Sequence, residues 1–280
     1  MKSCKEIAEQ ITRATKLRID RRPKWQQAPV LCLISVGSDN RWYSSWLARD
    51  CKEVGIIPVQ VNLLSCVPQD NLEWRIQEAN KYATCIGLLG STAETADQAR
   101  RVDMARARNL IEPSKRLGAL APQPYKSYAV TAIMLWLRVN FRLSGKRALI
   151  AVKSMEPMQR RGSELHKLVS ALYSLNIRVE AHLYTDLQSE TARRGVGNVD
   201  LVILNADEPG WFDASVCKPE CIIVDAGMST SGTTPDGSAR IRGDLKAGTA
   251  AHVAAVASMD TGLMALYHAV LLEKVAEHGT

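Results

Sequence analysis

Two polar clusters along this sequence contain side chains that could bind a ligand. Lys153 and Ser154 follow an apolar segment directly, and a lysine and a hydroxyl in such a turn are able to contact a phosphate. Arg160 and Arg161 come next and could hold an anion, although clustered arginine on a loop is more often solvated surface or protein interface. The four residues predict, at most, weak anion binding.

Metal-binding chemistry is not indicated. Cys217 and Cys221 are the only close pair among seven cysteines, and their spacing is neither C-x-x-C nor accompanied by nearby histidines. The five histidines also form no cluster along the sequence. We therefore expect no metal site, and we interpret the scattered cysteines as reduced core residues of a cytosolic or organellar protein.

Apolar segments that alternate with helical patterns must position these side chains. With 280 residues, 46% of them hydrophobic and 23% charged, the chain is long and apolar enough to bury one large core or two moderate ones. The alternation predicts an α/β protein with parallel sheets. The expected strands are 30–36, 57–63, 86–89, 147–152, 177–183, 201–204 and 221–225.

Helical patterns lie between these strands and after them. They are expected at 42–54, 70–82, 96–110, 128–141 and 262–277, with a further alanine-rich helix before the last one. The proline-rich segment 121–125 marks a candidate domain junction. No apolar run approaches the roughly 20 residues that a membrane-spanning helix needs.

Several short phrases occur in the order in which one known family has them. They are Cys51–Ile56, Leu143–Ala148, Asn198–Val202, Val216–Pro219, Ile222–Gly227, Pro235–Gly237 and Gly243–Asp244. Together they resemble the bifunctional methylenetetrahydrofolate dehydrogenase/methenyltetrahydrofolate cyclohydrolase family over nearly the whole chain. The resemblance implies an N-terminal three-layer α/β domain, a Rossmann-like doubly wound parallel-sheet domain, folate chemistry between them, and usually a homodimer.

On this resemblance, residues 1–125 form the N-terminal α/β domain, and the C-terminal helix in 262–280 packs back on it. Residues 126–261 form the Rossmann-like domain. The first domain corresponds to the folate site of the family and the second to its NAD(P) site, and we expect both sites to be degenerate.

The family's site residues are mostly replaced in this sequence. Its tyrosine is kept at Tyr43, but its lysine position is Leu47, its glutamine position is Ser91 and its pterin-binding aspartate position is Gly118. A leucine can neither donate nor accept a proton. The first glycine of the nucleotide turn is Val152, which would fill space that the pyrophosphate needs. We therefore expect no catalytic residues and no cofactor, with Lys153 and Ser154 as weak candidates for nucleotide contact.

These replacements favour a catalytically inactive homologue, not an enzyme, that serves as a structural or accessory subunit of a larger assembly. A mitochondrial respiratory complex or the mitochondrial ribosome is the expected host, with other protein subunits as partners. The alternative is an active NAD(P)-dependent dehydrogenase/cyclohydrolase whose catalytic groups have been relocated. Nucleic-acid contact is conceivable from the net charge of +7, but no RNA-binding motif supports it.

Most of the net positive charge lies in the first 24 residues. This segment has eight basic and three acidic side chains, a net charge of +5, which leaves only +2 for the other 256 residues. It predicts the first helix of the fold or a basic amphipathic signal for mitochondrial targeting; a cytoplasmic location is the alternative.

Overall fold

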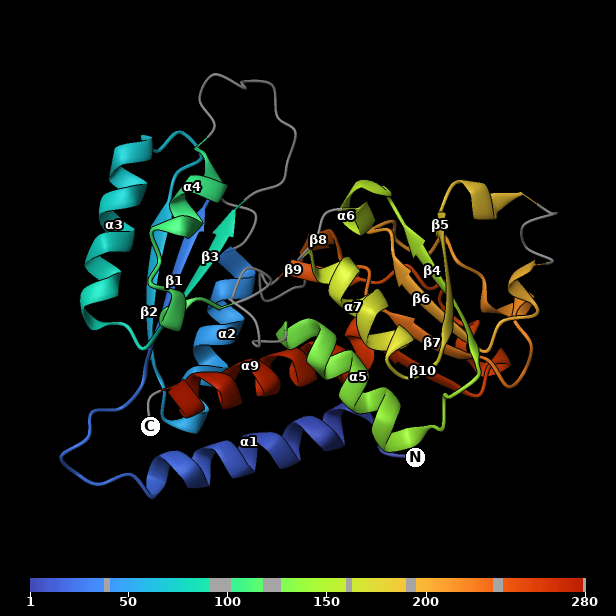
Figure 1. Ribbon diagram of the computed structural model, residues 1–280, viewed down its shortest axis with the longest axis horizontal. Coiled ribbons are helices and arrows are strands. Elements are labelled where there is room, and N and C mark those ends of the chain that lie inside the picture. Colours follow the sequence, from blue (N-terminus) through green and yellow to red (C-terminus); the bar gives the residue numbers. More distant parts are fainter. Residues whose placement is uncertain are drawn as a thin grey trace. The chain divides into compact units, whose positions relative to one another are not determined.

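The computed structural model describes residues 1–37, 41–90, 102–117, 127–159, 163–189, 195–233 and 239–278. The chain divides into two compact units (Figure 1). The N-terminal unit consists of Glu9–Ser127 and His268–Thr280, and the Rossmann unit consists of Met1–Ala8 and Tyr128–Tyr267. No helix in the described ranges combines the length and the apolar character that a membrane crossing requires.

A three-stranded parallel sheet forms the middle layer of the N-terminal unit. Its strand order is β2-β1-β3, and Val30 of β1 pairs with Ile57 of β2. The strands are β1 (Val30–Val36), β2 (Ile57–Leu63) and β3 (Cys85–Gly90). The helices of this unit are α2 (Arg41–Val54), α3 (Gln69–Tyr82) and α4 (Met104–Asn109), joined by parts of α1 (Cys4–Asp20) and α9 (Met264–His278).

Alternate residues of β1 serve the two faces of this sheet. Cys32, Ile34 and Val36 pack with Leu72 and Ile76 of α3 in one apolar cluster. The residues between them, Leu31, Leu33 and Ser35, are also buried and point to the opposite face, where Figure 1 shows α2 and α9. The unit is therefore built of a helical layer, a sheet and a second helical layer.

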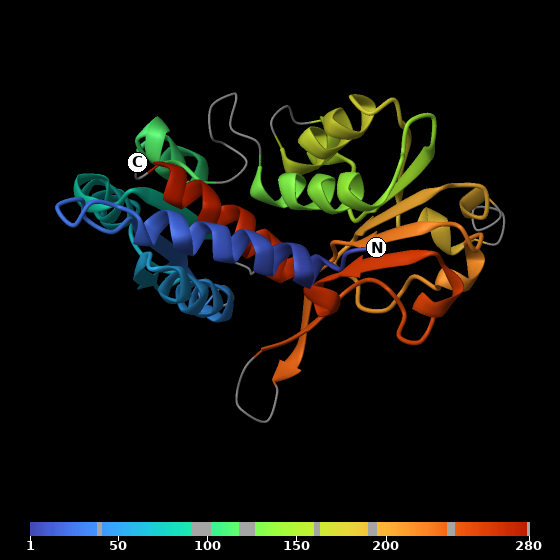
Figure 2. The same ribbon diagram turned by 90° about the horizontal axis from the view of Figure 1, so that it is seen from below.

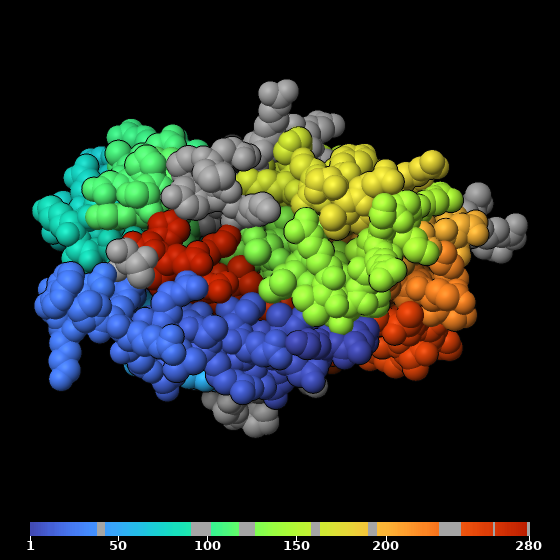
Figure 3. Space-filling view, turned by 60° about the horizontal axis from the view of Figure 1, so that its bottom comes forward, coloured from blue at the N-terminus to red at the C-terminus, as the bar shows by residue number. Residues whose placement is uncertain are grey.

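The last helix, α9, packs back on the N-terminal unit from His268 onward, which confirms the expected docking of the C-terminal helix. It lies along α1 in Figures 1 and 2, and the space-filling view of Figure 3 shows the visible part of α9 against α1. Arg18 of α1 forms an ion pair of 3.1 Å with Glu277, and Arg22 donates a hydrogen bond of 2.9 Å to the carbonyl of Ala276. The apolar face of α9 is buried, because Leu266, Val270 and its other large aliphatic side chains are nearly inaccessible.

The Rossmann unit contains a five-stranded parallel sheet of order β10-β7-β6-β4-β5. Its strands are β4 (Arg147–Val152), β5 (Arg178–Leu183), β6 (Leu201–Asn205), β7 (Ile222–Asp225) and β10 (Ala255–Ser258). The helices α5 (Tyr128–Asn140) and α7 (Glu164–Tyr173) pack together over one face (Figure 2), and the short α6 (Glu156–Gln159) precedes α7. This sheet confirms the predicted doubly wound fold.

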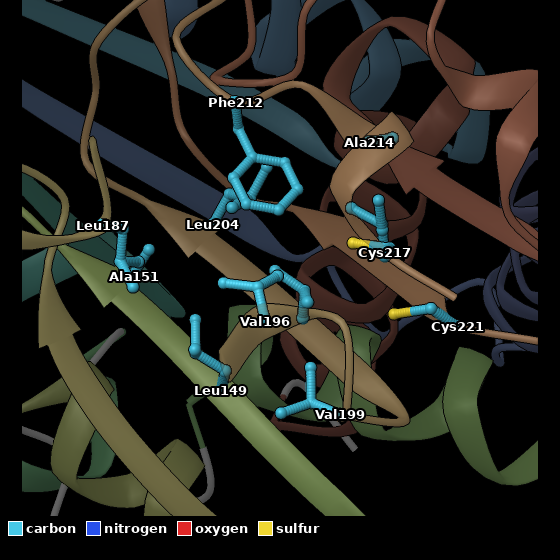
Figure 4. Close-up of a cluster of buried hydrophobic side chains, with 12 residues drawn as sticks. Leu149, Ala151, Leu187, Val196, Val199, Leu204, Phe212, Ala214, Cys217 and Cys221 are labelled. Atoms are coloured by element: carbon cyan, nitrogen blue, oxygen red, sulfur yellow. The ribbon is translucent and has the colours of Figure 1, made fainter. Parts of the chain in front are cut away.

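An apolar cluster covers the other face of this sheet (Figure 4). Leu149, Leu204 and Phe212 pack there with Cys217 and Cys221, whose sulfurs lie among aliphatic side chains. Both cysteines are free and buried. Within the described ranges, no three His, Cys, Asp or Glu side chains gather as metal ligands would.

The alanine-rich segment before the last helix is not the helix that we expected. After the antiparallel hairpin of β8 (Ser229–Thr233) and β9 (Ala239–Arg242), residues 255–258 form the edge strand β10, which pairs with β7 in register. Alanine favours a helix in isolation, but the buried edge of a parallel sheet offers hydrogen-bond partners for this backbone. Tertiary pairing therefore overrides the local propensity.

Candidate functional site

One face of α2 carries the positions that correspond to the tyrosine and the lysine of the family. Tyr43, Leu47 and Asp50 are spaced by four and three residues, which places them along the same side of a helix. Tyr43 is half-buried, whereas Leu47 is only 1% exposed and belongs to the core. Leu47 therefore serves packing, and the next polar group on this face is the Asp50 carboxylate.

Asp50 binds a histidine from the other end of the sequence. Oδ2 of Asp50 lies 2.5 Å from Nδ1 of His268, which α9 contributes to the N-terminal unit. The ring of His268 also meets the ring of Tyr43 edge to face, with 5.3 Å between centroids and 75° between planes. A phenol, an imidazole and a carboxylate are thus brought together inside one unit.

The other ring nitrogen of His268, Nε2, makes no hydrogen bond to the described residues. The side chain is 3% exposed, and Nε2 is buried without a hydrogen-bond partner in the described part of the chain. An ionised Asp50 accepts a hydrogen bond from Nδ1–H, so a neutral imidazole presents Nε2 as a base. Chemically, this arrangement is able to accept a proton and return it.

The neighbours of Asp50 differ in the chemistry that they can add. Arg49 approaches the other carboxylate oxygen at 3.4 Å and is mostly exposed. Cys51 is fully buried, and this burial, with a smaller contribution from the charge of Asp50, raises the pKa of its thiol to about 12. Cys51 therefore stays protonated and is no nucleophile.

In the Rossmann unit, the carboxyl ends of β4 and β6 form the point where the strand order reverses, which is where such sheets bind ligands. Lys153 follows β4 and forms an ion pair of 2.8 Å with Glu208, which follows β6. Ser154 accepts a hydrogen bond from the backbone N–H of Glu156 at 3.3 Å. Lys153, the candidate for a phosphate contact, is thus paired with the carboxylate of Glu208.

Two buried carboxylates brace the same edge of the sheet. Asp225, at the end of β7, accepts hydrogen bonds from the backbone N–H groups of Asp244 and Leu245 at 2.9 and 3.0 Å. Asp244 in turn accepts them from Ala206 and Glu208 at 2.6 and 2.7 Å. Burial raises the pKa of Asp225 to about 6 despite these donors.

This raised pKa predicts an unusual pH dependence of stability. A carboxyl group whose pKa is higher in the folded than in the unfolded chain stabilises the fold when it is protonated, and it loses that contribution as the pH rises. Between pH 3.8 and about 6, the stability of the wild type relative to Asp225→Asn should therefore fall by roughly 3 kcal/mol. Urea unfolding at a series of pH values measures this difference, and a constant difference would contradict it.

Asp213 provides a control of opposite sign. Hydrogen bonds from Ser215 and then Lys246 lower the pKa of this partly exposed carboxyl group to about 2. Its contribution to stability is present above the unfolded pKa and is lost as the pH falls toward 2. The wild type should therefore gain stability relative to Asp213→Asn as the pH rises from 2 to 4.

The structure places some of the predicted site residues and leaves others untouched. Tyr43 and Leu47 lie on α2 as expected, and Lys153 and Ser154 lie at the end of β4. Ser91 and Gly118 fall outside the described residues. The sequence analysis missed His268, although a histidine on the apolar face of the last helix, where only a buried partner could satisfy it, was a usable signal.

No family model matches this chain. A curated relative does: the bifunctional protein FolD of Nitratiruptor sp. is 24% identical over 246 residues, which cover 81% of each chain. Among solved structures, the chain is similar to the methylenetetrahydrofolate dehydrogenase-cyclohydrolase (FolD) of Trypanosoma brucei, which was solved with NADP and an inhibitor. The TM-score is 0.82, the sequence identity is 18%, and the match covers 100% of this chain and 96% of that one. For the FolD of Campylobacter jejuni, the TM-score is 0.79, the identity is 17%, and the match covers 99% of this chain and 97% of that one. These comparisons confirm the resemblance carried by the sequence phrases.

The same comparisons overturn the expected function. We expected an inactive homologue that is no enzyme and serves as a subunit of a larger assembly, but the relatives in sequence and in structure are dehydrogenase/cyclohydrolases, and nothing among them points to such an assembly. The expectation rested on the replacement of the family's residues at Leu47, Ser91, Gly118 and Val152. The pair of Asp50 and His268 is a proton-handling group outside those positions.

Proposed function

We propose that the chain is a member of the bifunctional FolD family and an enzyme acting on one-carbon units carried by tetrahydrofolate. Of the two reactions in the family's name, the hydrolysis of methenyltetrahydrofolate is the one that the geometry supports best. The observation that carries this choice is the cluster of Tyr43, Asp50 and His268 in the N-terminal unit.

Hydrolysis of a methenyl bridge is chiefly a problem of moving protons. Water adds to the carbon between two nitrogens, one carbon–nitrogen bond breaks, and a formyl group remains on the other nitrogen. Of the two protons of the water, one goes to the departing nitrogen and the other is released. A phenol beside a buried imidazole–carboxylate pair is suited to these proton transfers, and the reaction uses no nucleotide.

The dehydrogenase reaction needs a nicotinamide nucleotide, and the residues present do not fit its pyrophosphate. Val152 is buried at the position of the family's tight-turn glycine. Glu156 opens α6, and the carboxylate of Glu208 occupies Lys153. A negative side chain at a helix start disfavours phosphate binding, and the lysine of this turn is already paired. The turn after β4 therefore does not fit NADP.

Turnover of methenyltetrahydrofolate by the purified full chain tests the proposal. We expect hydrolysis, which the loss of the methenyl absorbance measures. The rate should fall about 100-fold in Tyr43→Phe because the phenolic proton is lost. Tyr173→Phe is the matched control, since Tyr173 is an exposed tyrosine in the Rossmann unit, and it should keep the wild-type rate. A wild-type chain without hydrolysis above the buffer rate would refute the proposal. A second arm with methylenetetrahydrofolate and NADP should form no NADPH.

Two further expectations accompany this function. FolD enzymes are typically homodimers, so we propose a homodimer here as well, which light scattering of the purified chain measures. A mitochondrial location remains a prediction from the basic residues of α1, and a fluorescent fusion of the full chain would test it.

A further inference from the structure

We propose that His268, held by Asp50, is the proton relay that replaces the family's lysine and acts through Tyr43. This inference rests on the proposed hydrolysis and names the group that moves its proton. It is drawn from three features of the described residues: the shared face of α2, the partner that α9 supplies, and the unpartnered nitrogen of the imidazole.

The position of Asp50 on α2 is the first step. The family's lysine stands one turn after its tyrosine, and in this chain that place is taken by Leu47, which is buried in the core. Asp50 lies about one turn farther along the same face. A carboxylate there cannot itself replace an ammonium group, but it can hold a second side chain that carries a proton.

His268 is that side chain. The contact of 2.5 Å between Oδ2 and Nδ1 fixes the orientation of the ring and the tautomer, because an ionised carboxylate accepts a hydrogen bond only from Nδ1–H. Nε2 is then left as a base. A carboxylate that orients an imidazole in this way also stabilises the imidazolium that forms when Nε2 takes up a proton.

The environment of Nε2 indicates a role beyond packing. A buried nitrogen without a partner is costly, and most buried polar atoms of folded proteins are satisfied. A leucine at this place would fill the space without that cost. An unsatisfied acceptor beside a tyrosine ring is the arrangement expected of a group that binds its proton only during a reaction.

Burial also decides the route of the proton. Because Nε2 is inaccessible, it does not meet the substrate, whereas Tyr43 is half-buried and in ring contact with His268. The phenol and Nε2 are not hydrogen-bonded in this structure. We infer that Tyr43 turns toward Nε2 when the substrate binds, and that it then takes a proton from the attacking water as it passes its own to Nε2. The proton then returns by the same route to the departing nitrogen, so His268 is a positioning and relay residue.

Within the described ranges, α2 supplies the ionisable groups that contact the imidazole. From α2, Asp50 contacts it directly and Tyr43 meets its ring, while Arg49 approaches only the other oxygen of Asp50. Cys51 is held protonated by burial. On α9 itself, Glu273 and Lys274 lie more than one turn away. A change in the pH profile on replacement of His268 would therefore report on this relay.

A purely structural role, in which the pair ties α9 to α2, makes different predictions. His268→Gln keeps a side-chain amide that can bond Asp50 but has no titratable nitrogen. If the relay is correct, kcat for methenyltetrahydrofolate should fall about 100-fold with KM within threefold, and the pH profile of kcat should change shape. Asp50→Asn should lower kcat about 10-fold or more, because the imidazolium loses its counter-charge.

Glu277→Gln provides the matched control. It removes the ion pair that ties α9 to α1, without touching the relay, and should leave kcat and its pH profile unchanged. Far-ultraviolet circular dichroism and thermal unfolding verify that each variant is folded. His268→Gln that is folded and keeps the wild-type kcat and pH profile would overturn the relay while the proposed function stands. A wild-type chain that hydrolyses no methenyltetrahydrofolate overturns the proposed function and the relay with it.

Discussion

Gly243→Ala is expected to lower the free energy of unfolding by about 3–5 kcal/mol. A Cβ at this position would lie 2.6 Å from Cγ of Asp225 and closer still to its Oδ2. The carboxylate cannot move away cheaply, because both of its oxygens accept backbone hydrogen bonds from Asp244 and Leu245. The added methyl group must therefore break bonds to a buried charge or displace the backbone, and urea unfolding measures the loss.

Two further glycines make this prediction specific. Gly227→Ala would press its Cβ against the carboxylate of Asp244 and should destabilise to a similar degree. Gly195→Ala meets no heavy atom within 4 Å and should change the free energy of unfolding by less than about 0.5 kcal/mol. Equal stability of the Gly195 and Gly243 variants would mean that the carboxylate is not held as described.

Leu47→Lys is expected to destabilise the chain by about 3–5 kcal/mol without raising hydrolysis. The substitution restores the residue type of the family, but Leu47 is 1% exposed, and Asp50, the nearest carboxylate on this face of the helix, is already held by His268. The new ammonium would be buried without a partner. Urea unfolding and the hydrolysis assay measure the two effects.

Ser45→Lys is the control for this substitution. Ser45 is exposed on the same helix, so a lysine there reaches water and should leave stability within about 0.5 kcal/mol of the wild type. A Leu47→Lys chain that is as stable as the wild type and hydrolyses faster would show that this position faces the substrate, and it would contradict the assignment of the relay.

The strands of this chain could be predicted because buried parallel strands are short, continuous apolar runs. The expected bounds of 30–36, 57–63 and 147–152 are those of β1, β2 and β4. The edge strand β10 could not be predicted in this way, since its alanines carry little apolar surface and favour a helix locally. Only its pairing with β7 makes it a strand.

The site could be predicted only in part, for a related reason. Tyr43 and Leu47 are close in sequence and stand in a phrase that resembles a known family. Asp50 and His268 are 218 positions apart, and no local pattern links them. The hypothesis of an inactive chain rested on comparing each position with its counterpart in the family. Such a comparison does not detect a side chain that a distant helix contributes.

The docking of α9 on the N-terminal unit has a consequence for the order of synthesis. The ribosome makes residues 9–127 first, but the helix that completes their apolar layer emerges only after the whole Rossmann unit has been made. Until then, the face of the sheet that carries Leu31 and Leu33 has α2 but lacks the part of its cover that α9 supplies, so this unit cannot reach its final packing while translation continues. The N-terminal unit, whose last segment is made after the Rossmann unit, therefore completes its folding sooner when the Rossmann unit folds promptly. The relay can form only after His268 has been added to the chain.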